Sequence, residues 1–495
     1  MSWLLAAPIL IPLATAVATF LVPVRWLGAA GVIALLAADA MLLARVASDG
    51  VIAAQIAGWP APFGITLVAD HLSALMVVIT GVMGLATALY ALPEIDRRRR
   101  AYGFEPLFQL LLAGMGGAFL TGDLFNLYVW FEVIVIASFA LLALGGDLRQ
   151  LEATVKYAVL NLVSTALLLS GIGLLYGLTG TLNMADLHLQ VRAVENLGLL
   201  TGIAMLFIVA IGVKAAIFPL FFWIPASYHT PPVAISAIFA GLVTKVGVYA
   251  LVRVFTLIFT HDVGYTHTIL LVVAAFTMVT GVLGAVSQNE FRRILSFHSV
   301  SQIGYMVLGL ALFTPLALAG AIFFMAHHSV VKTNLFLVSG VAARLAGSFQ
   351  LKRLGGLYQE RPLLASLFLV SAFSLGGIPP FTGFWGKLIL VRASLEVGHY
   401  LLAAVALGVG LLTLLSMAKI WAEVFWKARP AEAGPAPPPA ALAETALLLV
   451  PIVGLAALTF AGGIWLEPIF DFMSQAGYSL RDPMLYVQAV LGTGR

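Results

Sequence analysis

The stretch GDLFNLYVWFEVIVIASFALLAL, residues 122–144, is long and apolar enough to cross a membrane, yet it contains a glutamate. Glu132 follows Asp123, near one end, by nine residues, which is about 13 Å along a helix and close to mid-bilayer. An ionisable side chain at that depth is costly, faces protein or water, and indicates a functional site. The stretch therefore predicts a membrane helix with a functional carboxylate.

The composition of the whole chain agrees with this interpretation. Of the 495 residues, 61% are hydrophobic and 10% are charged, whereas soluble domains carry about 25% charge. The mean hydropathy is +1.04. This excludes a soluble globular protein and predicts an all-α polytopic membrane protein, because lipid cannot satisfy exposed backbone groups. The absence of cysteine excludes disulfides and thiolate metal sites, and the net charge of +4, spread over many loops, indicates no nucleic-acid partner.

Apolar segments of about 20 residues, the length that crosses a bilayer, recur about fourteen times. The expected spans are residues 3–22, 27–48, 67–92, 104–121, 124–144, 153–178, 197–225, 231–257, 265–288, 293–313, 317–343, 362–398, 400–426 and 443–470. The stretch 362–398 is interrupted, and we interpret it as one broken span. The Pro/Ala-rich segment 427–445 is the clearest linker.

Lysine and arginine predict the orientation of the spans, because cytoplasmic loops carry an excess of both. The basic residues gather in alternate loops: Arg97 to Arg100, Arg149, Lys156, Arg292, Arg293, Arg344, Lys352, Arg353, Arg361, Lys427 and Arg429. The opposite loops carry few, such as Arg45 and Arg192. We therefore expect the basic loops in the cytoplasm and both termini outside.

Further ionisable residues lie deep in predicted spans. They are Lys214, Lys245, His298, His327, His328, Lys332 and Lys387. Pro219 follows Lys214 and removes a helical hydrogen bond beside it. Pro379 and Pro380 precede Lys387 in the same way. Interrupted helices in two halves of a transporter point to repeats with a site at their interface.

Several of these residues also have structural explanations. A lysine near a span end, such as Lys419, can extend its ammonium group to the headgroups. His298 can be a hydrogen-bonded core residue, and Lys156, Asp123 and Arg253 are expected at the interface. His327 and His328 point about 100° apart on a helix, and Lys332 shares a face better with His328.

A mechanism follows from burial and charge. Burial disfavours the charged form of a lysine or glutamate, and an opposite charge nearby restores it. We expect Glu132 and Lys214 to form a buried pair whose opening releases a proton to the next group. Lys245, His328 and Lys332 would then pass charge to Lys387, with water between them. A metal site of Glu132, His327 and His328 lacks the usual ligand spacing, so we expect neither metal nor cofactor.

The motifs GDLFNLYVWFEV, VKAAIFPLFFWIPASYHTPPVAISAIFAGLVTKVGVYAL, FHSVSQIGYM, HHSVVKTNLFLVSG and GGIPPFTGFWGK carry a resemblance that spans almost the whole chain. They resemble the antiporter-like subunits shared by respiratory complex I, membrane-bound hydrogenases and Mrp-type cation/proton antiporters. The similarity is greatest to the D-type subunits of the Mrp antiporters. NLYVWFE, HHSVVKTNLFLVSG and the tail DPMLYVQAVLG favour that group.

The resemblance implies fourteen helices with two inverted five-helix repeats and broken helices seven and twelve. The expected parts are residues 1–103 with three helices, 104–257 and 258–427 with one repeat each, and 428–495 with the linker, the last helix and the tail. It also implies that the proton-relay positions fall on Glu132, Lys214, Lys245, His298, His328, Lys332 and Lys387.

The implied activity is secondary Na⁺/H⁺ exchange in a bacterial cytoplasmic membrane, so we expect a transporter subunit and no enzyme. The expected partners are the other subunits of an Mrp-type complex (A, B, C, E, F and G), together with H⁺, Na⁺ and lipid. The alternative is a proton-pumping subunit of a complex I-type dehydrogenase or a hydrogenase, which would contain the same buried charges. A membrane scaffold without transport would not explain the deep ionisable residues.

Overall fold

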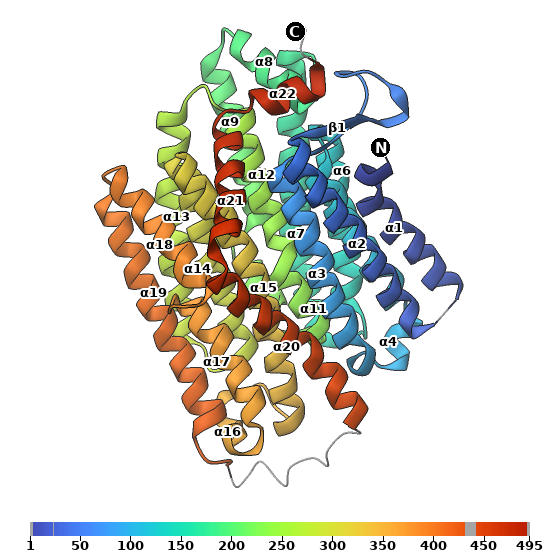
Figure 1. Ribbon diagram of the computed structural model, residues 1–495, viewed down its shortest axis with the longest axis vertical. Coiled ribbons are helices and arrows are strands. Elements are labelled where there is room, and N and C mark those ends of the chain that lie inside the picture. Colours follow the sequence, from blue (N-terminus) through green and yellow to red (C-terminus); the bar gives the residue numbers. More distant parts are fainter. Residues whose placement is uncertain (1–2, 23, 431–441, 493–495) are drawn as a thin grey trace.

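The computed structural model describes residues 3–22, 24–430 and 442–492, which form one bundle of mostly upright helices (Figure 1). The first part contains α1 (Trp3–Leu21), α2 (Arg25–Asp49), α3 (His71–Glu94), α4 (Arg97–Ala101), α5 (Phe104–Leu120), α6 (Leu124–Ala143), α7 (Leu148–Thr179), α8 (Met184–Gln190), α9 (Leu197–Ala215), α10 (Trp223–Ser227), α11 (Val233–Ile238) and α12 (Thr244–Leu257). The second part contains α13 (Val263–Ser287), α14 (Phe291–Leu312), α15 (Pro315–Ala346), α16 (Leu357–Glu360), α17 (Pro362–Gly376), α18 (Thr382–Glu396), α19 (Tyr400–Ile420), α20 (Leu442–Ile464), α21 (Leu466–Arg481) and α22 (Met484–Leu491).

The predicted fold class of an all-α polytopic membrane protein is confirmed. Twelve helices of the described part are long and apolar enough to cross a membrane. The shorter apolar helix α5 and the broken pair α17 and α18 complete the set of expected spans. Most of the predicted linker 427–445 lies outside the described residues.

Both predicted helix breaks are present. α9 ends at Ala215, and Ala216 has a left-handed φ of 59° before the chain resumes in α10. α17 ends at Gly376, and Gly377 has a φ of 91°, a conformation that glycine adopts without strain. α18 then starts at Thr382. The prolines therefore place the breaks as their missing N–H groups require.

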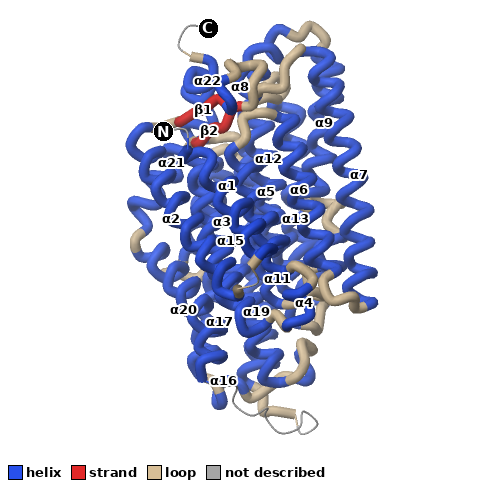
Figure 2. Tube along the Cα trace, turned by 90° about the vertical axis from the view of Figure 1, so that its right-hand side faces the viewer, coloured by secondary structure: helices blue, strands red, loops and turns tan. Residues whose placement is uncertain are grey.

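The two ends of the bundle differ. One end carries the N-terminus, the short helices α8 and α22, and an antiparallel hairpin of β1 (Ile52–Gln55) and β2 (Thr66–Ala69) (Figures 1 and 2). The arginine-rich helix α4 and the short helix α16 lie toward the other end. The arginine-rich helix α4 therefore lies away from the end that holds both described termini.

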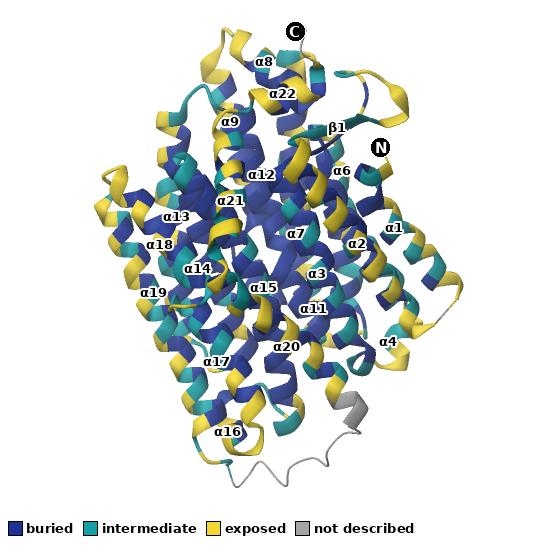
Figure 3. Ribbon diagram, in the orientation of Figure 1, coloured by how far each residue is buried: buried dark blue, intermediate teal, exposed yellow. Residues whose placement is uncertain are grey.

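Burial separates the helices into a shielded centre and a periphery (Figure 3). In its most apolar window, the continuous helix Val233–Leu257 is 100% buried, α14 is 94% buried and α15 is 89% buried. The corresponding windows of α1, α2, α7 and α13 are 39% buried. The helices that carry Lys245, His298, His328 and Lys332 are therefore the ones best shielded from lipid.

Candidate ion-relay site

Glu132 and Lys214 come together through a third residue, one that the sequence does not single out. The hydroxyl of Thr165 on α7 donates to Glu132 Oε1 over 2.5 Å. Lys214 Nζ donates to the same hydroxyl oxygen over 3.4 Å and lies 4.9 Å from the centre of the Phe131 ring. Lys214 is buried and Glu132 is partly exposed. The expected pair is thus linked through threonine, and no direct ion pair between the two is found in the described residues.

Lys245 lies where the helical pattern of its own span changes. Residues Phe239–Val243 form a π-helical turn between α11 and α12. Lys245 is fully buried, and its Nζ donates to the carbonyl of Ala240 inside that turn. A π-turn leaves backbone carbonyls off the regular hydrogen-bond ladder, and such turns are frequent at functional sites. The ammonium group therefore has one backbone acceptor within its own helix.

His328 lies next to two buried lysines. Lys245 and Lys332 are its strongest electrostatic neighbours, and neither ring nitrogen of His328 has a hydrogen-bond partner among the described residues. Lys332 Nζ donates to the carbonyl of Leu295 on α14 over 2.6 Å. An imidazole with two free nitrogens can accept a proton at one and donate from the other. The expected shared face of His328 and Lys332 is thus present.

His298 connects this group to the second broken helix. Its Nε2 contacts Ser416 Oγ of α19, and its electrostatic neighbours are Lys332 and Lys387. Lys387 Nζ donates to the carbonyls of Leu375 and Gly376 over 2.8 and 3.1 Å. These carbonyls belong to the last turn of α17, the negative end of the helix dipole. The break thus provides acceptors for the ammonium group of Lys387.

His327 faces another direction from His328. Its Nδ1 lies 2.8 Å from Thr382 Oγ1 and 3.5 Å from Ser374 Oγ, on either side of the α17–α18 break. Lys387 is its electrostatic neighbour. His327 therefore lies beside the broken helix, and His328 lies beside Lys245 and Lys332.

The electrostatic neighbours fall into two groups. One group contains Glu132 and Lys214, and the other extends from Lys245 to Lys387. Between the groups, α12 packs directly on the backbone of α9. A Cβ on Gly247 would lie 2.4 Å from Ala215 N and 2.6 Å from Lys214 C. The absence of a side chain at Gly247 therefore allows α12 and α9 to lie in close contact between the two groups.

We expect Gly247→Ala to push α12 away from α9. Overpacking of a closely packed core costs about 1–3 kcal/mol, so the thermal unfolding temperature of the purified protein should fall, and cation-dependent proton exchange should fall with it. Gly202→Ala on α9 is the matched control, because a Cβ there meets nothing within 4 Å. Equal unfolding temperatures for the two variants would contradict the close contact.

The helix α3 holds the Lys245 helix at both ends. Near one end, Arg253 donates to Asp70 through two bonds of 2.6 and 2.9 Å, and Asp70 is the N-cap of α3. At the other end, the Glu94 carboxylate accepts the N–H groups of Val233 and Ala234, at 2.5 and 2.8 Å. The sequence predicts Arg253 at the membrane interface, and the structure places it four residues before the end of α12, buried in an ion pair with Asp70.

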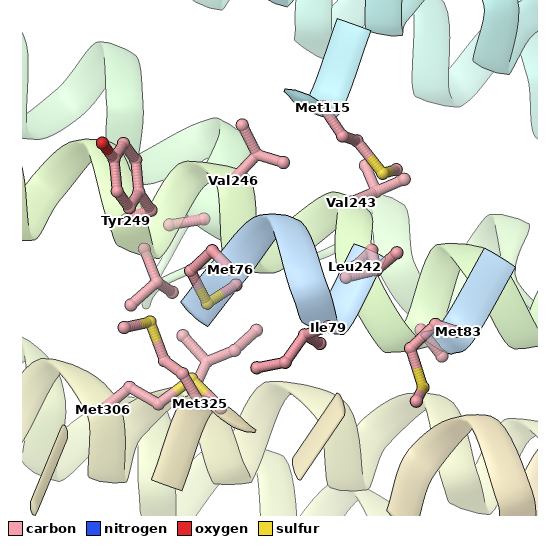
Figure 4. Close-up of a cluster of buried hydrophobic side chains, with 14 of the residues drawn as sticks. Met76, Ile79, Met83, Met115, Leu242, Val243, Val246, Tyr249, Met306 and Met325 are labelled. Carbon is pink, nitrogen blue, oxygen red and sulfur yellow. The ribbon is translucent and has the colours of Figure 1, made fainter. Parts of the chain in front are cut away.

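The middle of α3 packs between the Lys245 helix and the helices α14 and α15, as Figure 4 shows. The side chains in this contact are Met76, Ile79 and Met83 of α3, Leu242, Val243 and Val246 of the Lys245 helix, and Met306 and Met325 of α14 and α15. Tyr90 also donates to the carbonyl of Leu337 on α15 over 3.2 Å. α3 therefore packs against the Lys245 helix and α15, and Met306 of α14 lies in the same apolar cluster.

A polar cavity of about 960 Å³ opens among the basic loops. Its charged and titratable lining residues are Asp147, Arg149, Glu152, Lys156, His229, Glu290, Arg292, Arg293 and Arg353. Burial, with Arg292 and Arg293 nearby, lowers the pKa of His229 to about 4, so this imidazole is neutral at physiological pH. Lys156 is exposed and pairs with Glu152. The cavity offers water access from the basic end of the bundle.

Other sequence-predicted residues have structural roles. Lys419 Nζ donates to the carbonyls of Val286 and Gln288 over 3.1 and 2.7 Å, which caps the end of α13. Asp123 is the N-cap of α6 and accepts the Asn126 N–H. Lys419 is therefore tied to protein backbone at the end of a neighbouring helix.

Together, the apolar helices and the shielded centre of the bundle define a polytopic membrane protein. A family model described as "NADH:quinone oxidoreductase/Mrp antiporter, TM" matches residues 121–413. The chain belongs to this family.

Relatives and solved structures agree with the family. The D subunit of the Na(+)/H(+) antiporter of Alkalihalophilus pseudofirmus is 47% identical over 460 residues, which are 93% of this chain and 92% of the relative. A chain of the Mrp complex from Dietzia sp. DQ12-45-1b is 35% identical with a TM-score of 0.91, covering 99% of this chain and 100% of that one. A chain of the membrane-bound sulfane sulfur reductase, an archaeal respiratory membrane complex, is 27% identical with a TM-score of 0.91, covering 99% of each chain.

Proposed function

We propose that this chain is the proton-translocating subunit of a multisubunit Na⁺/H⁺ antiporter. In this function it couples proton influx to sodium efflux and is a transporter subunit rather than an enzyme. The observation that carries the proposal is the buried group of Lys245, His328, Lys332, His298 and Lys387, in which each member has another as an electrostatic neighbour. The 47% identity to the D subunit of a Na(+)/H(+) antiporter supports the exchange activity.

The proposed path has two sections. In the first, Glu132 exchanges a proton with Lys214 through the hydroxyl of Thr165, which contacts both. In the second, the proton passes along the buried group to Lys387 at the α17 break. Water bridges the space between Lys214 and Lys245, and the cavity among the basic loops supplies protons to or removes them from the row.

We propose domain boundaries in which residues 1–103 and 428–495 flank two inverted five-helix repeats, 104–257 and 258–427. The two broken helices, each beside a buried lysine, support the repeats. We also propose a bacterial cytoplasmic membrane, with the basic loops inside and both termini outside. The common end of the two described termini supports this orientation.

We assign the sodium path to the partner subunits of an Mrp-type complex, of the A, B, C, E, F and G types. The buried row consists mainly of lysines and histidines, and positive charges repel a sodium ion most strongly in a medium of low dielectric constant. Sodium is a hard cation that prefers oxygen ligands, as Ca²⁺ and Mg²⁺ do. The match to a chain of the Mrp complex supports assembly with other subunits.

The alternative is a proton-pumping subunit of a redox complex. The fold match to the sulfane sulfur reductase complex supports this alternative as strongly as the Mrp match supports the antiporter, because the two TM-scores are equal. The identities of 35% and 27% favour the antiporter. Purification of the chain with its partners distinguishes the two, since iron–sulfur or flavin subunits would indicate a redox complex.

Lys245→Met tests the relay in everted membrane vesicles that contain the assembled complex. We expect Na⁺-dependent pH change to fall at least about tenfold, the effect of about 1.4 kcal/mol on a barrier. Methionine keeps the length and apolar stem of the side chain and removes only the titratable group. Lys419→Met is the matched control, because that lysine caps α13 and lies outside the relay. An assembled Lys245→Met complex with wild-type exchange would remove Lys245 from the path.

A further inference from the structure

Asp39 is a carboxylate in the middle of α2, outside the row described above. It lies 14 residues after Arg25 and 10 before Asp49, the ends of α2, or about 21 and 15 Å along the helix. Its exposed fraction is 0%. No sequence prediction concerned it, and it lies outside the stretch that the family model matches. Its depth makes it as costly to ionise as the relay residues.

The contacts of Asp39 explain how an acid fits between two helices. Neither carboxyl oxygen has a hydrogen-bond partner among the described residues. The neighbouring helix α3 presents Gly81, where a Cβ would lie 2.9 Å from Asp39 Oδ2 and 3.0 Å from Leu36 Cα. The carboxyl group therefore occupies space that the missing side chain of Gly81 leaves open. An unpaired carboxylate in such surroundings takes up a proton and becomes neutral.

The nearest charged group along α2 is Arg45, six residues or about 9 Å from Asp39. The helices α1, α3 and α5 pack against α2. Besides Asp39, the titratable residues of α2 are Arg25, Arg45 and Asp49, those of α3 are His71, Tyr90 and Glu94, and that of α5 is Glu105; α1 has none. Arg45 pairs with Asp49 at 2.7 Å, and Glu105 lies beside Gly28, eleven residues before Asp39. On α3, the nearest to Gly81 is Tyr90, nine residues or about 13 Å away. Within the described part of the chain, neither Asp39 oxygen has a hydrogen-bond partner, charged or neutral.

We propose that Asp39 is a second proton-binding site, separate from the relay, that binds and releases one proton. The ligand is a proton rather than Na⁺, because Na⁺ requires several oxygen ligands and neither oxygen of this carboxyl has a polar partner among the described residues. When the proton leaves, the bare carboxylate requires water, and its hydration separates α2 from α3 at Gly81. The protonation state of Asp39 therefore sets how closely these helices pack.

The helix α3 gives this site a route to the relay. α3 holds Arg253 through Asp70 at one end and the N–H groups of Val233 and Ala234 through Glu94 at the other. A shift of α3 at Gly81 changes both attachments of the helix that carries Lys245. The influence of Asp39 on transport rests on the proposed function, whereas proton binding by Asp39 does not.

Infrared difference spectra of the purified complex between mildly acidic and alkaline buffers test proton binding without any transport. We expect the wild type to lose a carbonyl band of a buried protonated acid on alkalinisation. Asp39→Asn should lack this band, and Asp39→Glu should shift its frequency. Glu132→Gln, which alters the other deep carboxyl, should leave it in place. Asp39→Glu answers the question if Asp39→Asn does not assemble.

Three results would overturn the proposal. The first is a wild-type spectrum that loses no such band, and the second is a band unchanged in Asp39→Glu or Asp39→Asn. The third is a band that responds to Na⁺ at constant pH, which would indicate a cation site. In vesicles, an assembled Asp39→Asn complex should exchange several-fold more slowly than wild type with an altered pH profile. Wild-type exchange with a titrating Asp39 band would leave the proton site in place and remove its coupling to the relay.

Discussion

Replacing Lys214 by methionine is expected to reduce Na⁺-dependent proton exchange at least about tenfold, the change that about 1.4 kcal/mol in a barrier produces. Lys214 is the buried ammonium nearest Glu132, and the Thr165 hydroxyl joins the two groups. Methionine removes the charge and retains an apolar stem, so the fold should tolerate it. Exchange in everted vesicles, with the amount of assembled complex measured in the same membranes, provides the test.

The Thr165 hydroxyl offers a finer control for the same prediction. Thr165→Val removes the hydroxyl and keeps the branched shape, so exchange should fall, by less than in Lys214→Met because water can replace the link. Thr165→Ser keeps the hydroxyl and should exchange like the wild type. If Lys214→Met assembles and exchanges normally, the Glu132–Lys214 section is not part of the path.

The spans and breaks could be predicted because each rests on local chemistry. Apolar length identifies a membrane helix in any context, and Pro219 and Pro379 interrupt a helix wherever they occur within one. The depths of Lys245 and Lys387 in the membrane follow from the number of residues between each lysine and the ends of its apolar span. The tertiary structure then decides what each ammonium group contacts, which for both is a backbone carbonyl.

The contacts between helices could not be predicted, because they depend on which faces meet. Thr165 is an ordinary residue of a membrane helix in sequence, and only the packing of α6, α7 and α9 places it between Glu132 and Lys214. Arg253 lies eight residues beyond Lys245, which suggests an interfacial position. Its partner Asp70 is 183 residues away in the chain. Asp39 could have been found from the sequence, because a lone carboxylate in the middle of an apolar span is as unusual there as Glu132 is in its own span.

Arg253→Met is expected to destabilise the protein by about 3–5 kcal/mol, because it leaves the buried carboxylate of Asp70 without its counter-charge. Asp70 and Arg253 have side chains only 6% and 4% exposed. The Arg253 guanidinium also lies over the rings of Tyr249 and Tyr486, at 5.3 and 5.1 Å from their centres. Thermal unfolding of the purified complex measures the loss.

The double variant Asp70→Asn/Arg253→Met separates charge from packing. Asparagine is a good N-cap, so it retains the helix start at Asp70 and removes the negative charge. Replacing both members of a buried ion pair costs much less than removing one. We therefore expect the double variant to unfold at a higher temperature than Arg253→Met alone. If both unfold at the same temperature, the contribution of Arg253 lies in its contacts with Tyr249 and Tyr486. The double variant can regain thermal stability while its Na⁺-dependent proton exchange stays low. That result would show that the ion pair positions the Lys245 helix for transport, because restored folding alone would not have restored exchange.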